Sequence, residues 1–337
     1  MRDAGEGAPL VHDQDVLSRA YQQGRLVEED FALDRAPDLL AQQGTVLWLD
    51  LYRPSHEELA ALGERLGLHE LAVEDAAEPH QRPKVDHYDT HLFVACPAVG
   101  LDGRTGDLET TEVDVFLGRG YLVTVRKGDG FPVEDLLKAW DRSPELTARG
   151  PAYLLYGLLD TLVDGYYDVV QVFEDFYDEV SEAIFTERPI ELSKQQHWFQ
   201  MRRALARFHR LAAQVREAVS SLLRREHATI DTTLYPYYQD VYDHVLRVTE
   251  STDALRDLVG TIVDTNVALR DILLNQVMKK LTGWAAIVAV PTLVTGFYGM
   301  NVPFPGHGQE WGVAVAILLI VVLSGGLYVA FKKKDWL

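Results

Sequence analysis

The sequence predicts an α+β cytoplasmic domain followed by a long α-helical stalk and two C-terminal transmembrane helices. Three features carry this prediction: short runs of β-branched and aromatic residues before residue 127, long helical patterns from residue 153, and two uncharged apolar stretches near the end of the chain. The chain has 337 residues and a formal net charge of −19. Because such an acidic chain is unsuited to a general nucleic-acid-binding surface, no nucleic acid partner is expected.

Residues 1–150 are predicted to form the mixed α/β domain. Ser55, with Glu58 three residues later, matches a capping box and predicts a helix that ends near Leu66. Pro132 predicts the start of another helix, because proline is favoured in the first helical turn. Runs rich in Val, Leu, Phe and Tyr, bounded by turn residues, predict strands at 45–51, 91–98, 111–117 and 120–126.

Residues 151–235 are predicted to form two long helices of opposite charge. Nine acidic residues and no lysine or arginine lie between Asp160 and Glu187, whereas residues 194–225 carry eight basic residues and one acid. Acids at positions i and i+4 of one helix repel each other. Two readings stay open: the basic helix neutralises the acidic one in an antiparallel hairpin, or divalent cations bind diffusely along the acidic face.

Residues 236–280 are predicted to form a stalk helix that continues into the first apolar stretch. The pattern runs for some 60 residues after Pro236, about 90 Å at 1.5 Å per residue. A helix of that length without caps predicts packing against other helices or other copies of the chain. Gly260, Gly283 and Pro291 are the positions at which a break is most expected.

Two transmembrane helices are predicted at 281–300 and 312–331. Each apolar stretch is uncharged and close to the roughly 20 residues that cross about 30 Å of hydrocarbon. Two lysines precede the first span and a basic tail at 332–337 follows the second, while the linking segment 301–311 has no lysine or arginine. The positive-inside rule then places both termini in the cytoplasm and makes the chain a multi-pass protein of the cell membrane.

Cysteine usage points to the same compartment. The single Cys96 excludes an internal disulfide framework, and residues 1–15 contain no apolar segment typical of a secretory signal. Most of the chain is therefore expected in the reducing cytosol. One cysteine, without an HExxH or paired-cysteine spacing, gives poor support for a soft-metal site. No combination of nucleophile and base stands out, so the chain is not expected to be an enzyme.

A pore made by this chain requires several copies, because two helices cannot enclose an aqueous path. One face of the stalk and first span bears small, weakly polar and apolar side chains without charge, whereas the second span is apolar all round and suits contact with the lipid bilayer. The uncharged face can line a pore, and it can equally serve close helix packing in a membrane. Its members are Asn275, Met278, Leu281, Ala285, Ala289, Thr292 and Gly296.

Several motifs carry a more specific resemblance. The segment Tyr298–Gly299–Met300–Asn301 ends the first span, and Pro291–Thr292 and Gly296 precede it. Val73–Glu74–Asp75 and His80–Gln81–Arg82–Pro83–Lys84–Val85 lie in the N-terminal part. With these motifs the chain resembles the CorA family of magnesium transporters over essentially its whole length.

The resemblance implies a funnel-shaped homopentamer whose stalk and first span line the pore. Met278 and Leu281 are implied to form a hydrophobic gate. At the outer mouth, oxygen dipoles without fixed charge suit an ion that keeps its water shell. The implied mouth consists of Tyr298, Gly299, Met300 and Asn301. The implied pore-lining positions are Asn275, Ala289, Thr292 and Gly296.

The resemblance also implies regulatory Mg²⁺ bound between subunits by Asp75, with Glu74, and by Asp264. Asp240 corresponds to a further stalk acid. Mg²⁺ prefers oxygen ligands and sheds its water reluctantly, so carboxylates acting partly through water suit this role. The implied function is uptake of Mg²⁺, or of Co²⁺ or Ni²⁺, down the membrane potential, with Mg²⁺ as both the transported and the regulatory ion.

Two alternatives stay open. The same architecture serves a zinc-transporting branch of the family, and a membrane-anchored scaffold or sensor that does not conduct would share these helices. The linking segment also departs from the family pattern, because Glu310 is its only carboxylate where relatives often have an acidic stretch. Weaker attraction of ions to the mouth is therefore expected.

Overall fold

The computed structural model describes residues 16–131, 133–184, 192–224, 229–301, 303 and 305–336. By its internal contacts the chain divides into two compact units, one up to Val259 and one from Gly260. Helix α8 (Tyr235–Tyr298) passes through this boundary. The expected boundaries at residues 150, 235 and 280 are finer than this division and stay predictions.

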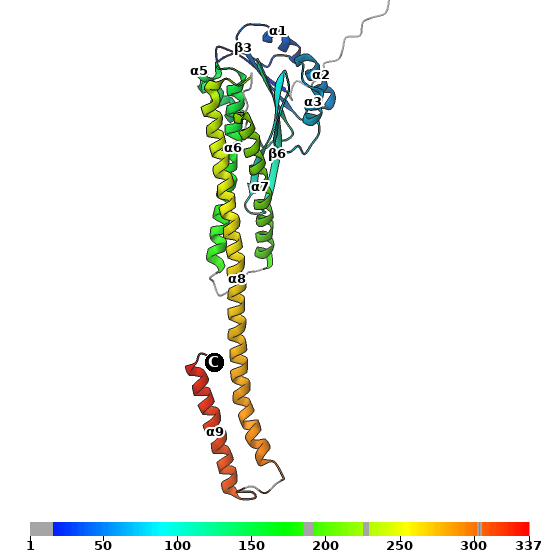
Figure 1. Cartoon of the computed structure of the whole chain (residues 1–337). Coiled ribbons are helices and arrows are strands. Elements are labelled where there is room, and N and C mark those ends of the chain that lie inside the picture. The colour runs from blue at the N-terminus through cyan, green and yellow to red at the C-terminus, as the bar shows by residue number, and fades with distance from the viewer. Residues whose placement is uncertain are drawn as a thin grey trace, which may run out of the picture. The chain divides into compact units, whose positions relative to one another are not determined.

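The first unit is built on one sheet, in which β3 and β6 are labelled in Figure 1. The sheet has seven strands in the order β2-β1-β3-β7-β6-β5-β4. Neighbouring strands are antiparallel except for β3 and β7, which are parallel. The predicted strands correspond to β3 and β7 and to parts of β5 and β6. The strands are β1 (Val16–Gln22), β2 (Arg25–Glu29), β3 (Thr45–Tyr52), β4 (Lys84–His87), β5 (His91–Asp102), β6 (Asp107–Gly118) and β7 (Tyr121–Arg126).

The sequence patterns miss three strands: β1, β2 and β4. β2 and β4 lie at the two edges of the sheet, where charged residues discourage pairing with other sheets. Their sequences, RLVEE and KVDH, lack the apolar run of a central strand. In β1 the polar Ser18 and Arg19 interrupt the apolar pattern. Ser18 is nevertheless buried, and its hydroxyl donates a hydrogen bond to the Phe31 carbonyl at 2.7 Å, which offsets the cost of burial.

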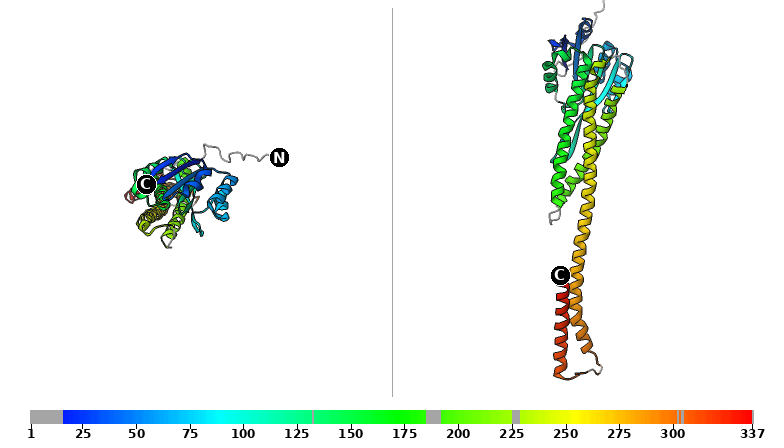
Figure 2. Two further views of the ribbon diagram at one scale, coloured as in Figure 1. Left: turned by 90° about the horizontal axis from the view of Figure 1, so that it is seen from above. Right: turned by 60° about the vertical axis from the view of Figure 1, so that its left-hand side comes forward.

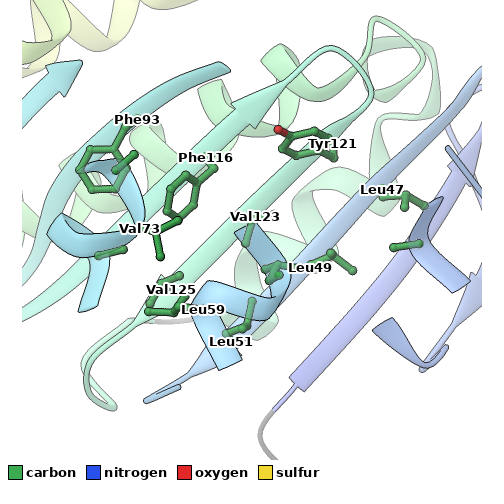
Figure 3. Packing of buried hydrophobic residues seen from close by; sticks show 14 of the residues in the cluster. Leu47, Leu49, Leu51, Leu59, Val73, Phe93, Phe116, Tyr121, Val123 and Val125 are labelled. Carbon is green, nitrogen blue, oxygen red and sulfur yellow. The ribbon is translucent and has the colours of Figure 1, made fainter. Parts of the chain in front are cut away.

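A hydrophobic core fills the space between one face of the sheet and helices α2 (His56–Leu66) and α3 (Glu70–Ala77) (Figure 3). Helix α1 (Ala36–Leu40), which follows the 3₁₀ turn η1 (Leu33–Arg35), adds Leu39 to this core. The predicted capping box of α2 is confirmed, because the Ser55 hydroxyl accepts from the Glu58 N–H and the Glu58 carboxylate accepts from the Ser55 N–H. Core side chains labelled in Figure 3 include Leu49, Leu59, Val73, Phe116 and Val123.

Helices α6 (Pro151–Ile184) and α7 (Leu192–Arg224) pack on the other face of the sheet, after the shorter α4 (Val133–Arg142) and α5 (Pro144–Thr147). Neighbouring residues of a strand point to opposite faces. On β5, Ala95 belongs to the core under α2 and α3, whereas Cys96 lies 3.8 Å from the Tyr166 hydroxyl of α6. The Tyr166 hydroxyl donates to the Pro97 carbonyl at 2.6 Å. The sheet is thus the middle layer of a three-layered unit.

The opposite charges predicted for α6 and α7 form no direct ion pair between the two helices among the described side chains. The two helices meet through apolar contacts such as Phe173 with Phe208, whose ring centroids are 6.1 Å apart. Neutralisation of one helix by direct ion pairs with the other is therefore not borne out for these side chains. The predicted charged residues outside the described side chains are Glu187, Lys194 and Arg225.

The second unit contains the end of α8 and helix α9 (Glu310–Lys333). α8 follows the 3₁₀ turn η2 (Thr232–Leu234) and is one helix of 64 residues, so no break occurs at Gly260, Gly283 or Pro291. α9 runs back beside the C-terminal part of α8 (Figures 1 and 2). Both helices contain segments that are long and apolar enough to cross a membrane.

Candidate functional site

One side of α8 carries the uncharged stripe predicted from the sequence. Every stripe residue from Asn275 to Gly296 is exposed in the single chain, with Met278 at 57% and Leu281 at 62%. A Cβ atom built on Gly296 would meet no other atom within 4 Å. The described part of one chain therefore leaves this stripe uncovered.

The opposite side of the same helix is less exposed. Gly283 and Val294 are buried there, and Ile287 and Val290 are half-buried. Each of these four residues lies two positions from a stripe residue, which is about 200° around a helix with 3.6 residues per turn. Because α9 runs beside this part of α8 (Figure 2), the stripe faces away from the side on which the two helices meet.

α8 ends at the predicted outer mouth. The Gly299 N–H donates to the Thr295 carbonyl at 2.9 Å, and a Cβ atom on Gly299 would approach that oxygen to 3.1 Å, so glycine suits this last turn. Tyr298 is half-buried, whereas Met300 and Asn301 are exposed just beyond the helix. The end of the helix thus presents the backbone groups of Gly299 and Met300 and the carboxamide of Asn301, and none of these groups carries a fixed charge.

Thr292 places a hydroxyl on the stripe. Its Oγ1 donates to the Val288 carbonyl one turn earlier, at 3.1 Å. Since its single proton is used in this bond, the oxygen has only lone pairs to offer, and it can accept from the water shell of a cation. Asn275 adds a carboxamide on the same side of the helix, nearer the first unit in the chain.

The predicted regulatory acids Glu74 and Asp75 lie on α3, where they line a hollow of about 520 Å³ between α3 and the edge strand β4. The Lys84 Nζ is 2.6 Å from Asp75 Oδ2 and 2.9 Å from Asp86 Oδ2. The hollow keeps an excess of negative charge, and its oxygen ligands suit a hard divalent cation. Its acidic and lysine side chains are Glu74, Asp75, Glu78, Lys84 and Asp86.

A second charged group fixes the segment after α3 to the sheet. The Lys127 Nζ lies 3.0 Å from the carboxylates of both Glu112 and Asp114. Burial raises the pKa of Asp114 to about 7, although Lys127 partly opposes this shift. Glu112 in turn accepts a hydrogen bond from the His80 N–H at 2.5 Å. The loop that leads from α3 to β4 is therefore held by ionic contacts.

Asp240 lies in a different acidic group, between α6 and α8. His244, one turn after Asp240, has its Nε2 3.7 Å from Asp240 Oδ1 and its Nδ1 3.8 Å from Asp160 Oδ1. One ligand atom each of Asp160, Asp164 and His244 lie within 4.8 Å of one another. A mixed set of carboxylates and one imidazole can hold a divalent metal. None of these residues lines the hollow beside α3.

In this α6–α8 cluster, which consists of Asp160, Asp164, Asp240 and His244, neighbouring acids crowd one another. Burial raises the pKa of Asp160, and the neighbouring Asp164 raises it further, while His244 opposes the shift. Burial also raises the pKa of Asp164. The buried Nδ1 of His244 makes no hydrogen bond within the described structure. Asp240 was predicted from the sequence as a stalk acid, and Asp160 and Asp164 belong to the acidic face on which diffuse cation binding was one of two readings. His244 was not predicted, although it lies four residues after Asp240.

Asp264, the remaining predicted acid, belongs to the second unit. It is exposed on α8, and it precedes Met278 by fourteen residues. Fourteen residues make nearly four complete turns, so the acid and the predicted gate lie on about the same side of the helix. One uninterrupted helix therefore connects Asp264 to the stripe.

Comparison with known proteins agrees with these features. The profile of the family described as CorA-like Mg2+ transporter protein matches residues 43–333. A cobalt/magnesium transport protein CorA from Thermotoga maritima is 32% identical over 280 residues, which are 82% of this chain and 79% of that protein. A protein of the same name from Methanocaldococcus jannaschii is 24% identical over 305 residues, which are 87% of this chain and 92% of that protein.

Solved structures show the same fold. The complete structure of the CorA magnesium transporter from Methanocaldococcus jannaschii matches with a TM-score of 0.77 at 20% identity, covering 96% of this chain and 99% of that one. The matched family consists of membrane transporters, which assigns the chain to transport and not to a class of enzymes. The chain belongs to the CorA-like Mg²⁺ transporter family.

Proposed function

We propose that the chain carries divalent cations, Mg²⁺ and Co²⁺, into the cell through a pore lined by several copies of α8. The observation that carries this proposal is the uncharged stripe from Asn275 to Gly296, which is exposed on the side of α8 away from α9. A side in contact with lipid would be as uniformly apolar as α9. Small and weakly polar side chains instead suit contact with water around a shared axis.

The transporting form is a homo-oligomer, because one copy of α8 encloses no path. A homopentamer is the form that the family resemblance implies. Both termini lie in the cytoplasm and the protein resides in the cell membrane, since Lys332 and Lys333 end α9 while the segment between the spans has no lysine or arginine.

The outer mouth selects an ion together with its water shell. Tyr298, Gly299, Met300 and Asn301 offer neutral oxygen dipoles, and Mg²⁺ gives up its water reluctantly, so these oxygens bind the shell and not the bare ion. A divalent ion that crosses 100 mV gains about 4.6 kcal/mol, which corresponds to roughly a thousandfold accumulation. The membrane potential therefore suffices to drive uptake.

Internal Mg²⁺ closes this pore. Asp75, with Glu74, of one subunit and Asp264 of the next are the proposed ligands, and Asp240 in the α6–α8 cluster serves a further site. The excess of carboxylates beside α3 supports this choice of hard oxygen ligands. Closure occurs at Met278 and Leu281, two apolar side chains that exclude water when copies of α8 come together. Loss of Mg²⁺ leaves facing carboxylates that repel each other and separate the stalks.

Uptake of Mg²⁺ into proteoliposomes with an inside-negative potential tests the transport proposal. Hexamminecobalt, a mimic of the hydrated ion that does not exchange its ligands, should block uptake. Asn301→Ala should reduce uptake about tenfold or more, because it removes a ring of carboxamides from the mouth. Gln309→Ala, which removes another exposed carboxamide of the outer segment, is the matched control.

Each outcome of the uptake experiment has a definite meaning. Wild-type uptake by Asn301→Ala would remove Asn301 from the mouth. Uptake of Zn²⁺ in place of Mg²⁺ would assign the chain to the zinc-transporting alternative. If correctly inserted oligomers take up no divalent cation, the remaining alternative is a membrane-anchored scaffold or sensor that does not conduct.

Asp264→Ala tests the regulatory proposal. In this variant, a higher Mg²⁺ concentration should be needed to close the pore and to protect the stalk from proteases, because one ligand of the bridging ion is lost. Glu250→Ala removes another exposed acid of α8 and serves as the control. If the Asp264→Ala variant closes its pore and resists proteases at the same Mg²⁺ concentrations as the wild type, Asp264 is not part of the sensor.

A further inference from the structure

We propose that Lys84 is a built-in cation that competes with Mg²⁺ for Asp75 and so sets the Mg²⁺ concentration to which the protein responds. This inference rests on the proposed role of Asp75 as a ligand of regulatory Mg²⁺. Lys84 begins the edge strand β4 and forms part of the wall of the hollow beside α3.

The Lys84 ammonium is held between two carboxylates. Its Nζ lies 2.6 Å from Asp75 Oδ2 and 2.9 Å from Asp86 Oδ2. Burial by itself would lower the pKa of Lys84, but the hydrogen bonds to these two carboxylates raise it above its ordinary value, so the group remains charged. The Nζ also lies 5.6 Å from the centroid of the Phe93 ring, which helps to fix the side chain.

Lys84 and Mg²⁺ are attracted to the same Asp75 carboxylate, and two cations at one carboxylate repel each other. Mg²⁺ binds a carboxylate oxygen at about 2.0–2.1 Å, or through one of its waters. The Lys84 ammonium already contacts Asp75 Oδ2, so a metal bound at either oxygen of this carboxylate is opposed by a nearby positive charge until the ammonium moves away. Asp86 offers the ammonium a second anion on its own strand, and exchange of partners therefore needs only a change of side-chain conformation.

The hollow stays attractive to a divalent cation while Lys84 occupies Asp75. Glu74 and Glu78 line the same hollow and are exposed, so one ammonium offsets only part of the negative charge. Lys84 thus lowers the affinity for Mg²⁺ without abolishing it. When Mg²⁺ leaves, the ammonium returns to Asp75 and reduces the repulsion among the acids of the hollow.

Lys84→Met tests the competition, because methionine removes the charge and keeps a flexible apolar side chain beside Phe93. In the full-length protein, the midpoint Mg²⁺ concentration for protection from limited proteolysis should fall about three- to tenfold. Lys84→Arg keeps the charge and should leave the midpoint at or above the wild-type value. Lys138→Met removes an exposed lysine that pairs with Asp135 on α4, far from the hollow in the chain, and should change nothing.

Asp75→Asn separates this inference from the proposed function. A raised midpoint in Asp75→Asn together with a lowered midpoint in Lys84→Met supports both. A raised midpoint in Asp75→Asn with an unchanged one in Lys84→Met overturns the competition and leaves Asp75 as a ligand. Unchanged midpoints in both variants overturn the role of Asp75 itself.

A raised midpoint in Lys84→Met would mean that Lys84 positions Asp75 for the metal, and this result also overturns the competition. Circular dichroism and thermal unfolding in the presence of EDTA check that each variant is folded. Lys84→Gln, which keeps a polar side chain at the wall of the hollow, replaces Lys84→Met if the latter does not fold, with the same expected fall in the midpoint.

Discussion

His91 is a titratable residue that the fold uses as a core aromatic. Its side chain on β5 is 1% exposed, and its ring stacks on Tyr88 with centroids 5.0 Å apart and lies against Phe116 at 5.8 Å. Its Nδ1 is 2.8 Å from the Thr90 hydroxyl, while the buried Nε2 makes no hydrogen bond in the described part of the chain. A proton on this ring would therefore be poorly solvated.

His91 should make the protein less stable as the pH falls from about 6.5 to about 4. Burial lowers the pKa of His91 to about 4 in the folded protein. Between these pH values the unfolded chain binds a proton that the folded chain does not bind, so protons favour unfolding. Relative to His91→Phe, the wild type should lose about 1–2 kcal/mol of unfolding free energy between pH 7 and pH 5.

Thermal unfolding followed by the fluorescence of the buried Trp48 and Trp140 measures this difference. The Tm of the wild type should fall by about 3 °C or more relative to the variant over that pH range. His56→Phe makes the same substitution at an exposed position that begins α2, and it should differ from the wild type by a constant amount. A difference between wild type and His91→Phe that does not change with pH would contradict the effect.

At the scale of elements, the sequence predicts the strands that carry apolar runs and the helices that show helical periodicity. It does not predict the strands at the edges of the sheet. The central strands β3 and β7 and the cap of α2 follow directly from local patterns. β2 and β4 were not predicted because edge strands are short and charged. α8 continues through Pro291, and transmembrane helices often tolerate an internal proline.

The same distinction separates the candidate sites. The stripe on α8 repeats along one helix, so the spacing of its residues in the sequence is enough to predict it. The α6–α8 cluster joins Asp160 and Asp164 to His244, which lies on another helix about 80 residues later. No single periodicity contains residues of two helices, and only the packing of α8 against α6 brings them together.

The α6–α8 cluster should distinguish Co²⁺ from Mg²⁺ through His244. Imidazole is a good ligand for Co²⁺, whereas Mg²⁺ prefers oxygen. His244→Gln should weaken Co²⁺ binding about tenfold or more and Mg²⁺ binding by less than about threefold. Midpoints for protection from proteolysis, measured with each metal on the full-length protein, report the two effects.

His209→Gln is the control for this comparison. His209 lies on α7 with its Nε2 3.6 Å from Asp253, and it is not a member of the α6–α8 cluster. The control should change neither midpoint. Equal weakening of Co²⁺ and Mg²⁺ binding in His244→Gln would show that the imidazole is not a metal ligand.

At the scale of the whole molecule, one chain leaves large apolar surfaces uncovered. On α8, Leu274, Val277 and Leu293 are all more than half exposed, in addition to the stripe. Surfaces of this kind mark contacts with lipid or with other copies. The stripe and the α9 side of α8 are opposite, so the assembly can place only one of them at its axis.

Cross-linking through single cysteines tests which side of α8 faces the axis. Cys96 is the only cysteine of the sequence and is buried, so Cys96→Ala gives a background without thiols. In that background, oxidation of Met278→Cys should link copies in pairs, because equivalent positions come together around the axis. Since thiols join in pairs, a homopentamer must leave about one subunit in five unlinked even at completion.

Val290→Cys is the matched control, because Val290 is half-buried on the side of α8 opposite the stripe. This variant should remain monomeric on denaturing gels after the same oxidation. Complete pairing of Met278→Cys would exclude a homopentamer and indicate an even number of subunits. Linking of Val290→Cys without linking of Met278→Cys would place the α9 side at the axis, and the stripe would then be a packing surface and not the wall of a pore.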